Sequence, residues 1–268
     1  MTAPLLAPPD GPAAGGAGAG LVVDGVTVAF GGLVALDDVS LVARTGRVTG
    51  LIGPNGAGKT TLFNVISGVQ RAGRGRVELL GRDITHWRPH RRAAAGLGRT
   101  FQRMELFWTM TVAETVRLAV DAAAANRRTG RNRFRRADDA GAERTAELLE
   151  LCGLTALADV TAAQLSTGQA RVLELARAIA TRPAVLLLDE PSSGLDTVET
   201  KRFAAILDRV LRLGDIALVL VEHDVDLVFA VCQDIYVLEF GRIIATGDPG
   251  AIQADDLVRT AYLGEGIV

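Results

Sequence analysis

The sequence predicts an α/β fold with a mostly parallel core sheet, an N-terminal antiparallel β subdomain and an inserted helical subdomain. Residues 184–188 and 217–221 are apolar at every position, which is typical of strands buried on both faces. An amphipathic helical pattern at 197–213 separates them. Buried strands that alternate with helices indicate a parallel sheet covered on both sides. A glycine-rich turn between another apolar segment and a helix favours the same class.

Length and composition set limits on this prediction. The chain has 268 residues, of which 49% are hydrophobic, enough for one large α/β domain. No apolar run approaches the roughly 20 residues that cross a bilayer. The net charge of −2 does not favour a nucleic-acid partner. The two cysteines, Cys152 and Cys232, are expected to be small core residues.

The N-terminal region divides into a tail and a β subdomain. Residues 1–20 are rich in Ala, Gly and Pro and lack a basic start, which predicts a disordered tail rather than a signal peptide. One domain is predicted from 21 to 264. Alternating apolar residues at 22–30 and 33–41 indicate an antiparallel hairpin. A further short arm at 77–80 and a strand within 94–102 complete this region.

Helical patterns dominate residues 104–182, the predicted helical subdomain. The helices are expected to begin after Thr111, to cover 143–152 and to cover 169–180. The stretch 126–136 carries many arginines and is either a solvated loop or a contact for an anionic partner. Strands are predicted again at 184–188 and 217–221, followed by a hairpin at 235–245.

The turn reads G-P-N-G-A-G-K-T and matches the spacing of the nucleotide-binding P-loop. Its backbone N–H groups and the helix N-terminus favour a phosphate. Lys59 is expected to reach the β- and γ-phosphates, and the Thr60 hydroxyl to bind Mg²⁺. The alternative is a glycine-rich turn that ends in lysine by chance. The expected ATP contacts are Gly53, Pro54, Asn55, Gly56, Ala57, Gly58, Lys59, Thr60 and Thr61.

Two carboxylates follow the apolar strand at 184–188. Ligands bind at the carboxyl ends of strands in open α/β sheets. Asp189 is therefore expected to hold Mg²⁺, and Glu190 to orient the water that attacks the γ-phosphate. The alternative is a solvated acidic turn.

The sequence L-S-T-G-Q at 165–169 precedes a predicted helix. Ser166 suits a helix N-cap, which is one interpretation. With the P-loop and Asp189–Glu190, however, the chain resembles the ATP-binding cassette (ABC) ATPases over nearly all of 21–264. The resemblance implies that Ser166, Gly168 and Gln169 contact ATP held by a second ABC ATPase subunit, and that ATP hydrolysis drives transport.

Four further residues take roles from this resemblance. Phe30 matches the aromatic that stacks on adenine, or is a core residue at a strand end. Gln102 matches the glutamine that contacts Mg²⁺ and the membrane partner. Asp196 lies in a loop that crosses the dimer interface in the family. His223 matches the histidine that bonds the γ-phosphate, although a histidine at a strand end can also be structural.

Other segments resemble importer ATPases for branched-chain amino acids, urea or short amides. They are G-R-T-F-Q at 98–102, L-F at 106–107, M-T-V at 110–112, V-E-H-D at 221–224 and A-Y-L-G-E at 261–265. The resemblance implies permease subunits, a solute-binding protein and a place at the cytoplasmic face of the cell membrane. Thr167 and Ala170 depart from the family's usual residues. The alternatives are a lipopolysaccharide-type ABC ATPase and a soluble ABC ATPase without a transport role.

Overall fold

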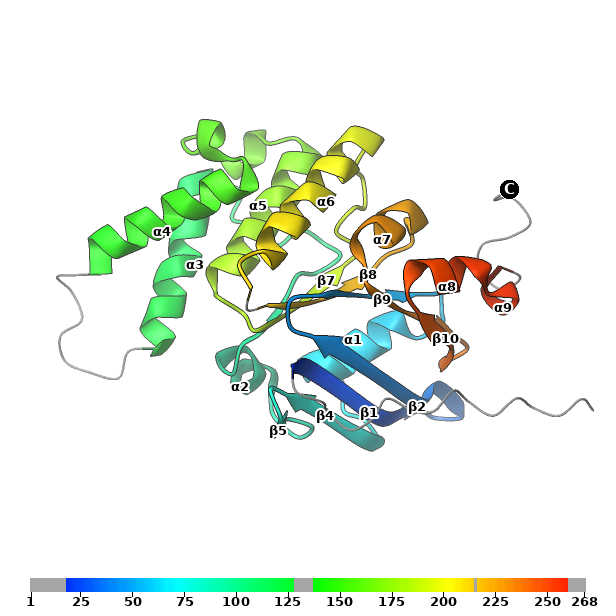
Figure 1. Cartoon of the computed structure of the whole chain (residues 1–268). Coiled ribbons are helices and arrows are strands. Elements are labelled where there is room, and N and C mark those ends of the chain that lie inside the picture. The colour runs from blue at the N-terminus through cyan, green and yellow to red at the C-terminus, as the bar shows by residue number, and fades with distance from the viewer. Residues whose placement is uncertain (1–17, 128–136, 215, 260–268) are drawn as a thin grey trace, which may run out of the picture.

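The computed structural model describes residues 18–127, 137–214 and 216–259. Two sheets and several helices form layers, and α1 (Lys59–Ser67) lies between the sheets (Figure 1). The first strand begins at Ala19, just before the predicted domain start at residue 21. Three predictions fall largely or wholly outside the described residues: the tail at 1–20, the arginine-rich stretch at 126–136 and the motif at 261–265.

The N-terminal sheet is antiparallel, with the strand order β2-β1-β4-β5. Its strands are β1 (Ala19–Phe30), β2 (Leu33–Arg44), β4 (Arg74–Leu79) and β5 (Arg82–Asp83). β1 and β2 form the predicted hairpin, in which Phe30 pairs with Leu33. The predicted antiparallel subdomain is confirmed.

The larger sheet has six strands in the order β10-β9-β3-β8-β7-β6. They are β3 (Val48–Ile52), β6 (Leu97–Arg99), β7 (Val185–Asp189), β8 (Ala217–Val221), β9 (Asp234–Glu239) and β10 (Arg242–Gly247). All neighbours are parallel except β9 and β10. The loops after β3, β7 and β8 therefore meet at one edge of the sheet.

Strand β8 is apolar at every position because a hydrophobic core packs against each face of this sheet. Along β8, Leu218 and Leu220 join the core shared with the helical subdomain. Val219 and Val221 join the core shared with α1 and the antiparallel sheet. Because successive side chains alternate between faces, a strand between two cores needs an apolar residue at every position.

The remaining helices cover the larger sheet or project from it (Figure 1). They are α2 (Pro89–Ala94), α3 (Val112–Arg127), α4 (Ala137–Cys152), α5 (Thr167–Ala180), α6 (Thr197–Leu211), α7 (Val225–Val231), α8 (Pro249–Ala254) and α9 (Asp256–Val258), with 3₁₀ turns at Thr155–Leu157 and Ala162–Gln164. Within the described ranges, no helix is long and apolar enough to span a membrane.

The structure corrects two parts of the element prediction. The strand predicted within 94–102 is present as Leu97–Arg99, but the helix before it, which starts with Pro89 and runs to Ala94, is not predicted. The short helix α7 was not predicted; it begins where the Asp224 side chain accepts a hydrogen bond from the Leu227 N–H.

Both cysteines are core residues, as predicted. Cys152 and Cys232 are buried and unpaired. Burial raises the pKa of each thiol to about 12, so both stay protonated near neutral pH.

Candidate functional site

The glycine-rich turn connects β3 to α1 by a very close backbone approach. Gly53 has a left-handed φ of 149°, and a Cβ at this position would collide with the carbonyl oxygen of Leu238. Only glycine suits both conditions. The helix then begins after Gly58, which offers no side chain to cap it. The first N–H groups of α1 are therefore available to an anion.

Lys59 crosses the turn from the first position of α1. Its Nζ donates hydrogen bonds to the carbonyl oxygens of Gly53 at 2.6 Å and Pro54 at 2.9 Å. Burial lowers the pKa of Lys59, while the negative charges of Glu190 and Asp189 oppose this shift. A cation held beneath the loop in this way is suited to meet a phosphate bound on the loop.

A cavity of about 570 Å³ lies over this turn and is named the P-loop cavity here. It is lined by Phe30, Leu33, Val34, Ala35, Asn55, Gly56, Ala57, Gly58, Lys59, Thr60, Thr61, Glu190, Phe240 and Gly241. Phe30 is 50% exposed, so it is a rim residue and not a core residue. Gly53 and Pro54, at the start of the loop, do not line this cavity, and their carbonyl oxygens accept hydrogen bonds from Lys59.

The carboxylates after β7 have different surroundings. Asp189 ends the strand, is buried, and accepts a hydrogen bond from Arg99. Glu190 has a left-handed φ of 47°, which is uncommon for a residue with a side chain and frequent at functional sites. The Nε2 of Gln102 donates to Glu190 Oε2 at 2.9 Å. The structure thus brings together Glu190 and Gln102, two of the predicted site residues.

His223 follows β8 at the same sheet edge. Asp189 pairs with Val221 across the β7–β8 ladder, so the segment around His223 lies next to the carboxylates. The His223 side chain is exposed, and the backbone N–H of His223 donates to the carboxylate of the buried Glu222. The other Glu222 oxygen accepts the N–H of Ser192 at 2.7 Å. One buried carboxylate therefore ties the loop after β7 to the loop after β8.

The sequence L-S-T-G-Q forms the start of α5. The Ser166 hydroxyl accepts the Gln169 N–H at 3.2 Å, and the Gln169 side chain accepts the Ser166 N–H at 2.9 Å. This reciprocal capping box confirms the N-cap interpretation of Ser166 and leaves the phosphate interpretation open. Two residues here differ from those usual in the family. Ala170 is buried in the core, and Thr167 lies near Gly194.

Asp196 begins the next helix in the same manner. Its carboxylate accepts the N–H groups of Val198 and Glu199, each at 2.8 Å. Gly168 packs against the Glu199 side chain. We name Ser166, Gly168, Gln169 and Asp196 the signature face. None of these four residues lines the P-loop cavity, so within one chain they form a separate surface.

The predicted metal ligands offer a hydroxyl, a carboxylate and an amide from Thr60, Asp189 and Gln102. These hard oxygen donors suit Mg²⁺, which takes few protein ligands and keeps phosphate and water oxygens. In the ranges that the structure describes, no group of three or more His, Cys, Asp or Glu side chains could hold a metal alone. The donor set therefore fits a magnesium ion that arrives with a nucleotide.

Sequence reasoning missed two residues of this region. Phe240 lines the P-loop cavity, is 87% exposed and has a left-handed φ of 43°. An aromatic residue next to glycine at a hairpin tip is a signal that could have identified it. Glu222 was noted only within a motif, and its fully buried carboxylate was not anticipated.

Comparisons with known proteins agree with this geometry. A family model described as ABC transporter matches residues 36–193, and one described as branched-chain amino acid ATP-binding cassette transporter matches 242–268. The branched-chain amino acid transport ATP-binding protein BraF of Pseudomonas aeruginosa is 37% identical, covering 91% of this chain and 98% of its own. LivG of Salmonella typhimurium is 38% identical with the same coverage.

Two further comparisons concern the rival class and the fold. The lipopolysaccharide export ATP-binding protein LptB of Acidithiobacillus ferridurans is 38% identical over 87% of this chain and 91% of its own. A nucleotide-free ATP-binding cassette is 32% identical with a TM-score of 0.75, covering 91% of this chain and 99% of that one. The ADP conformation of another cassette is 31% identical with a TM-score of 0.79, covering 91% and 98%. The chain therefore belongs to the ABC transporter family, as an ATP-binding cassette ATPase of its branched-chain amino acid group.

Proposed function

We propose that this chain hydrolyses ATP to drive an importer for branched-chain amino acids or related small amides and urea. The observation that carries the proposal is the P-loop cavity, where Lys59 and Glu190 line one space. The triphosphate lies on the N–H groups at the start of α1, and Lys59 exchanges its two carbonyl partners for the β- and γ-phosphates. Phe30 stacks on the adenine from the rim of the cavity.

A magnesium ion bound with the nucleotide would supply neutralisation of phosphate charge. Thr60, Asp189 and Gln102 are the residues proposed to hold it. Their oxygens belong to α1, the end of β7 and the loop after β6.

Glu190 orients the attacking water in this proposal. The water oxygen bonds to the γ-phosphorus, its proton passes toward Glu190, and ADP leaves with the electrons of the broken P–O bond. The hydrogen bond from Gln102 holds one Glu190 oxygen and leaves the other for water. His223 donates to the γ-phosphate from the neighbouring strand end. Catalysis then depends on position and charge.

The signature face completes the nucleotide site of a second cassette. Ser166 and Gly168 lie at the N-terminus of α5, where N–H groups and the helix dipole favour a γ-phosphate. ATP binding closes the dimer because each triphosphate gains donors from both subunits. Hydrolysis removes that bridge, and the dimer opens.

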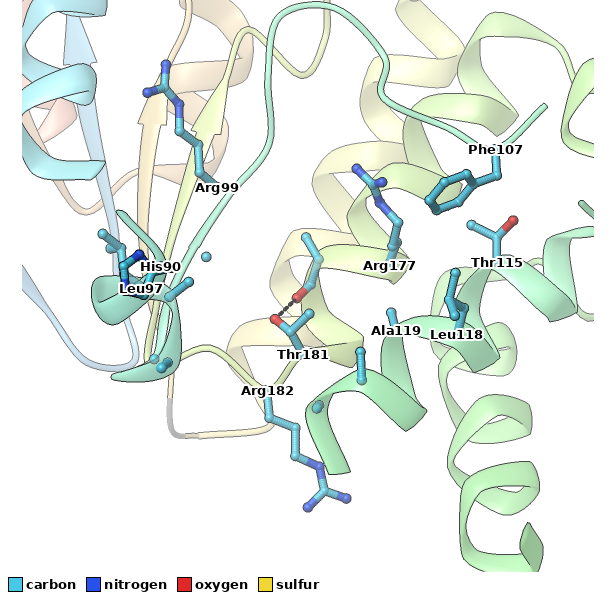
Figure 2. Close-up of a pocket in the computed structure, with 17 residues that line it drawn as sticks. His90, Leu97, Arg99, Phe107, Thr115, Leu118, Ala119, Arg177, Thr181 and Arg182 are labelled. Carbon is cyan, nitrogen blue, oxygen red and sulfur yellow. Dashed lines mark hydrogen bonds between the residues drawn. The ribbon is translucent and has the colours of Figure 1, made fainter. Parts of the chain in front are cut away.

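A groove of about 790 Å³ is proposed as the docking site of a permease subunit. Helix α2 and strand β6 border it on one side and α3 on the other, with α5 between them (Figure 2). Phe107 and Leu118 line it and are 50% and 45% exposed, which suits an apolar partner. Permease chains would hold the cassette at the cytoplasmic face of the membrane and receive substrate from a solute-binding protein.

The groove and the catalytic residues share one segment. The backbone carbonyl of Gln102 accepts a hydrogen bond from Arg171 on α5 at 3.0 Å, and its side chain donates to Glu190. Movement of a permease segment between α3 and α5 would therefore reach Glu190 through Gln102.

Transport by the assembled complex tests this proposal. The cassette is purified with its permease chains, reconstituted in liposomes, and supplied with ATP on the cassette side and a solute-binding protein on the other. Leucine, isoleucine, valine, urea and acetamide are compared as radiolabelled substrates. We expect ATP-dependent uptake of at least one, and none with Lys59→Ala. Uptake of none, together with co-purification of lipopolysaccharide, would favour the LptB-like alternative.

A further inference from the structure

Arg99, the last residue of β6, holds a buried cation beside the metal-site carboxylate. Its Nη2 lies 2.9 Å from Asp189 Oδ2, and the two side chains are only 9% and 7% exposed. A buried ion pair of this kind is weak evidence for stability, because desolvation offsets the attraction. The Arg99–Asp189 ion pair therefore needs another explanation, and control of the position of the Asp189 carboxylate is one.

The guanidinium is fixed from several sides. Its Nη1 donates to Asn64 Oδ1 at 2.8 Å and to Ser67 Oγ at 2.9 Å, both on α1. Its plane also lies near the rings of Phe63 at 5.7 Å and Phe101 at 4.9 Å. These contacts leave the group little freedom, so it presents Nη2 to Asp189 in one orientation.

The contact occupies one oxygen of Asp189. Asp189 is the last residue of β7, so the sheet fixes its backbone. The remaining freedom of the carboxylate is rotation about the side-chain bonds. Arg99 restricts that rotation. Loss of a partner that orients a metal ligand typically lowers metal affinity by about 10–100-fold.

We propose that Arg99 is a positioning residue, which fixes the Asp189 carboxylate in the orientation that receives the Mg²⁺ of bound ATP. This inference rests on the proposed role of Asp189 as a metal ligand. Figure 2 shows the Arg99 side chain extending from the groove wall, away from Leu97 and His90. The residue therefore joins the wall of the proposed permease groove to the metal site.

The test measures how nucleotide affinity depends on metal. The full chain is purified in its complex as the wild type and as Arg99→Met, Arg99→Lys and Asp189→Asn. ATP affinity is determined in EDTA and over a Mg²⁺ titration, and the EPR spectrum of Mn²⁺ with bound ATP reports the metal's surroundings. We expect Arg99→Met to leave the affinity in EDTA unchanged. We expect it to raise the half-maximal Mg²⁺ concentration about tenfold.

Arg92→Lys is the matched control. Arg92 is also buried, but it donates its hydrogen bonds to the carbonyl oxygens of Val65, Ile66, Thr85 and Trp87 and not to Asp189. It should leave the Mg²⁺ midpoint unchanged. If the Mg²⁺ midpoint shifted equally in Arg92→Lys and in the Arg99 variants, the shift would result from a loosened fold, and the proposal would be overturned.

Other outcomes also decide. If Arg99→Met does not fold, Arg99→Lys provides the test, because it keeps the charge and loses the rigid fork; it should shift the midpoint by a smaller factor. Wild-type midpoints and Mn²⁺ spectra in the folded Arg99 variants overturn the proposal. Retention of the full metal response in Asp189→Asn would instead refute the proposed function of Asp189, which separates that failure from a failure of Arg99 alone.

Discussion

The P-loop cavity and the signature face are built by opposite means. The P-loop cavity depends on tertiary contacts between segments far apart in the sequence. The backbone of Gly53 packs against the Leu238 carbonyl, and the buried Lys59 donates to the Gly53 carbonyl. The signature face lies at the start of α5, where Ser166 is exposed and Gly168 is buried, and is held by local hydrogen bonds between residues three positions apart. We infer that changes in the cavity mainly alter the fold or the chain's own chemistry, whereas changes in the signature face mainly alter the assembled dimer.

The largest expected effect follows from Glu190→Gln. Loss of the carboxylate removes the group proposed to orient and deprotonate water, which contributes roughly 10²–10⁴-fold in such reactions. Steady-state ATPase activity of the complex should fall by at least about 100-fold, with ATP binding retained and the dimer held closed. Glu147→Gln changes an exposed carboxylate on α4 and should leave the rate unchanged. Full activity in Glu190→Gln would remove this residue from the mechanism.

Gly53→Ala tests the cavity side of the comparison. The added Cβ meets the Leu238 carbonyl, and the left-handed φ is unfavourable for alanine. Strain and overpacking together should lower the free energy of unfolding by about 3 kcal/mol or more. Chemical denaturation of the isolated chain measures this change. A variant as stable as the wild type would show that the P-loop does not depend on this close approach.

Gly168→Ala is the counterpart on the signature face. The added Cβ meets the Glu199 carboxylate, the flexible end of a side chain that can move aside. The free energy of unfolding should therefore change by about 1 kcal/mol or less, the value of one hydrogen bond. ATP turnover of the assembled dimer should nevertheless be lost, because the methyl group and the displaced Glu199 side chain change the shape of the α5 start, where the partner's phosphate is proposed to bind. Destabilisation as large as in Gly53→Ala would contradict the distinction between the two regions.

The smallest expected effect concerns Phe240 at the cavity rim. Its side chain is exposed and outside both cores, so Phe240→Ser should leave the stability unchanged within about 0.5 kcal/mol. If the ring contacts the bound nucleotide, the KM for ATP should rise about twofold to 13-fold, the effect of about 0.5–1.5 kcal/mol for an aromatic contact, with kcat retained. Leu257→Ser, which also changes an exposed apolar residue, is the control. An unchanged KM would exclude Phe240 from nucleotide recognition.

Local sequence patterns were sufficient for the elements that local physics determines. The P-loop spacing, the apolar strands and the capped start of α5 were all read correctly because each depends on neighbouring residues. The short helices α2 and α7 were missed because few residues define them and tertiary contacts decide their formation. The contacts of Arg99 with Asp189 and of Gln102 with Glu190 join residues 90 and 88 positions apart, and no local pattern specifies such pairs.

The hairpin of β9 and β10 has a consequence for biosynthesis. The Gly241 N–H donates to the carbonyl of Ala57 in the P-loop at 2.9 Å, and β3 lies between β8 and β9 in the sheet. The P-loop thus relies on neighbours in the β9–β10 hairpin, which is synthesised much later than the P-loop itself. A ribosome must release the β9–β10 hairpin before this loop gains its native contacts, so nascent chains that end before β9 should not bind ATP.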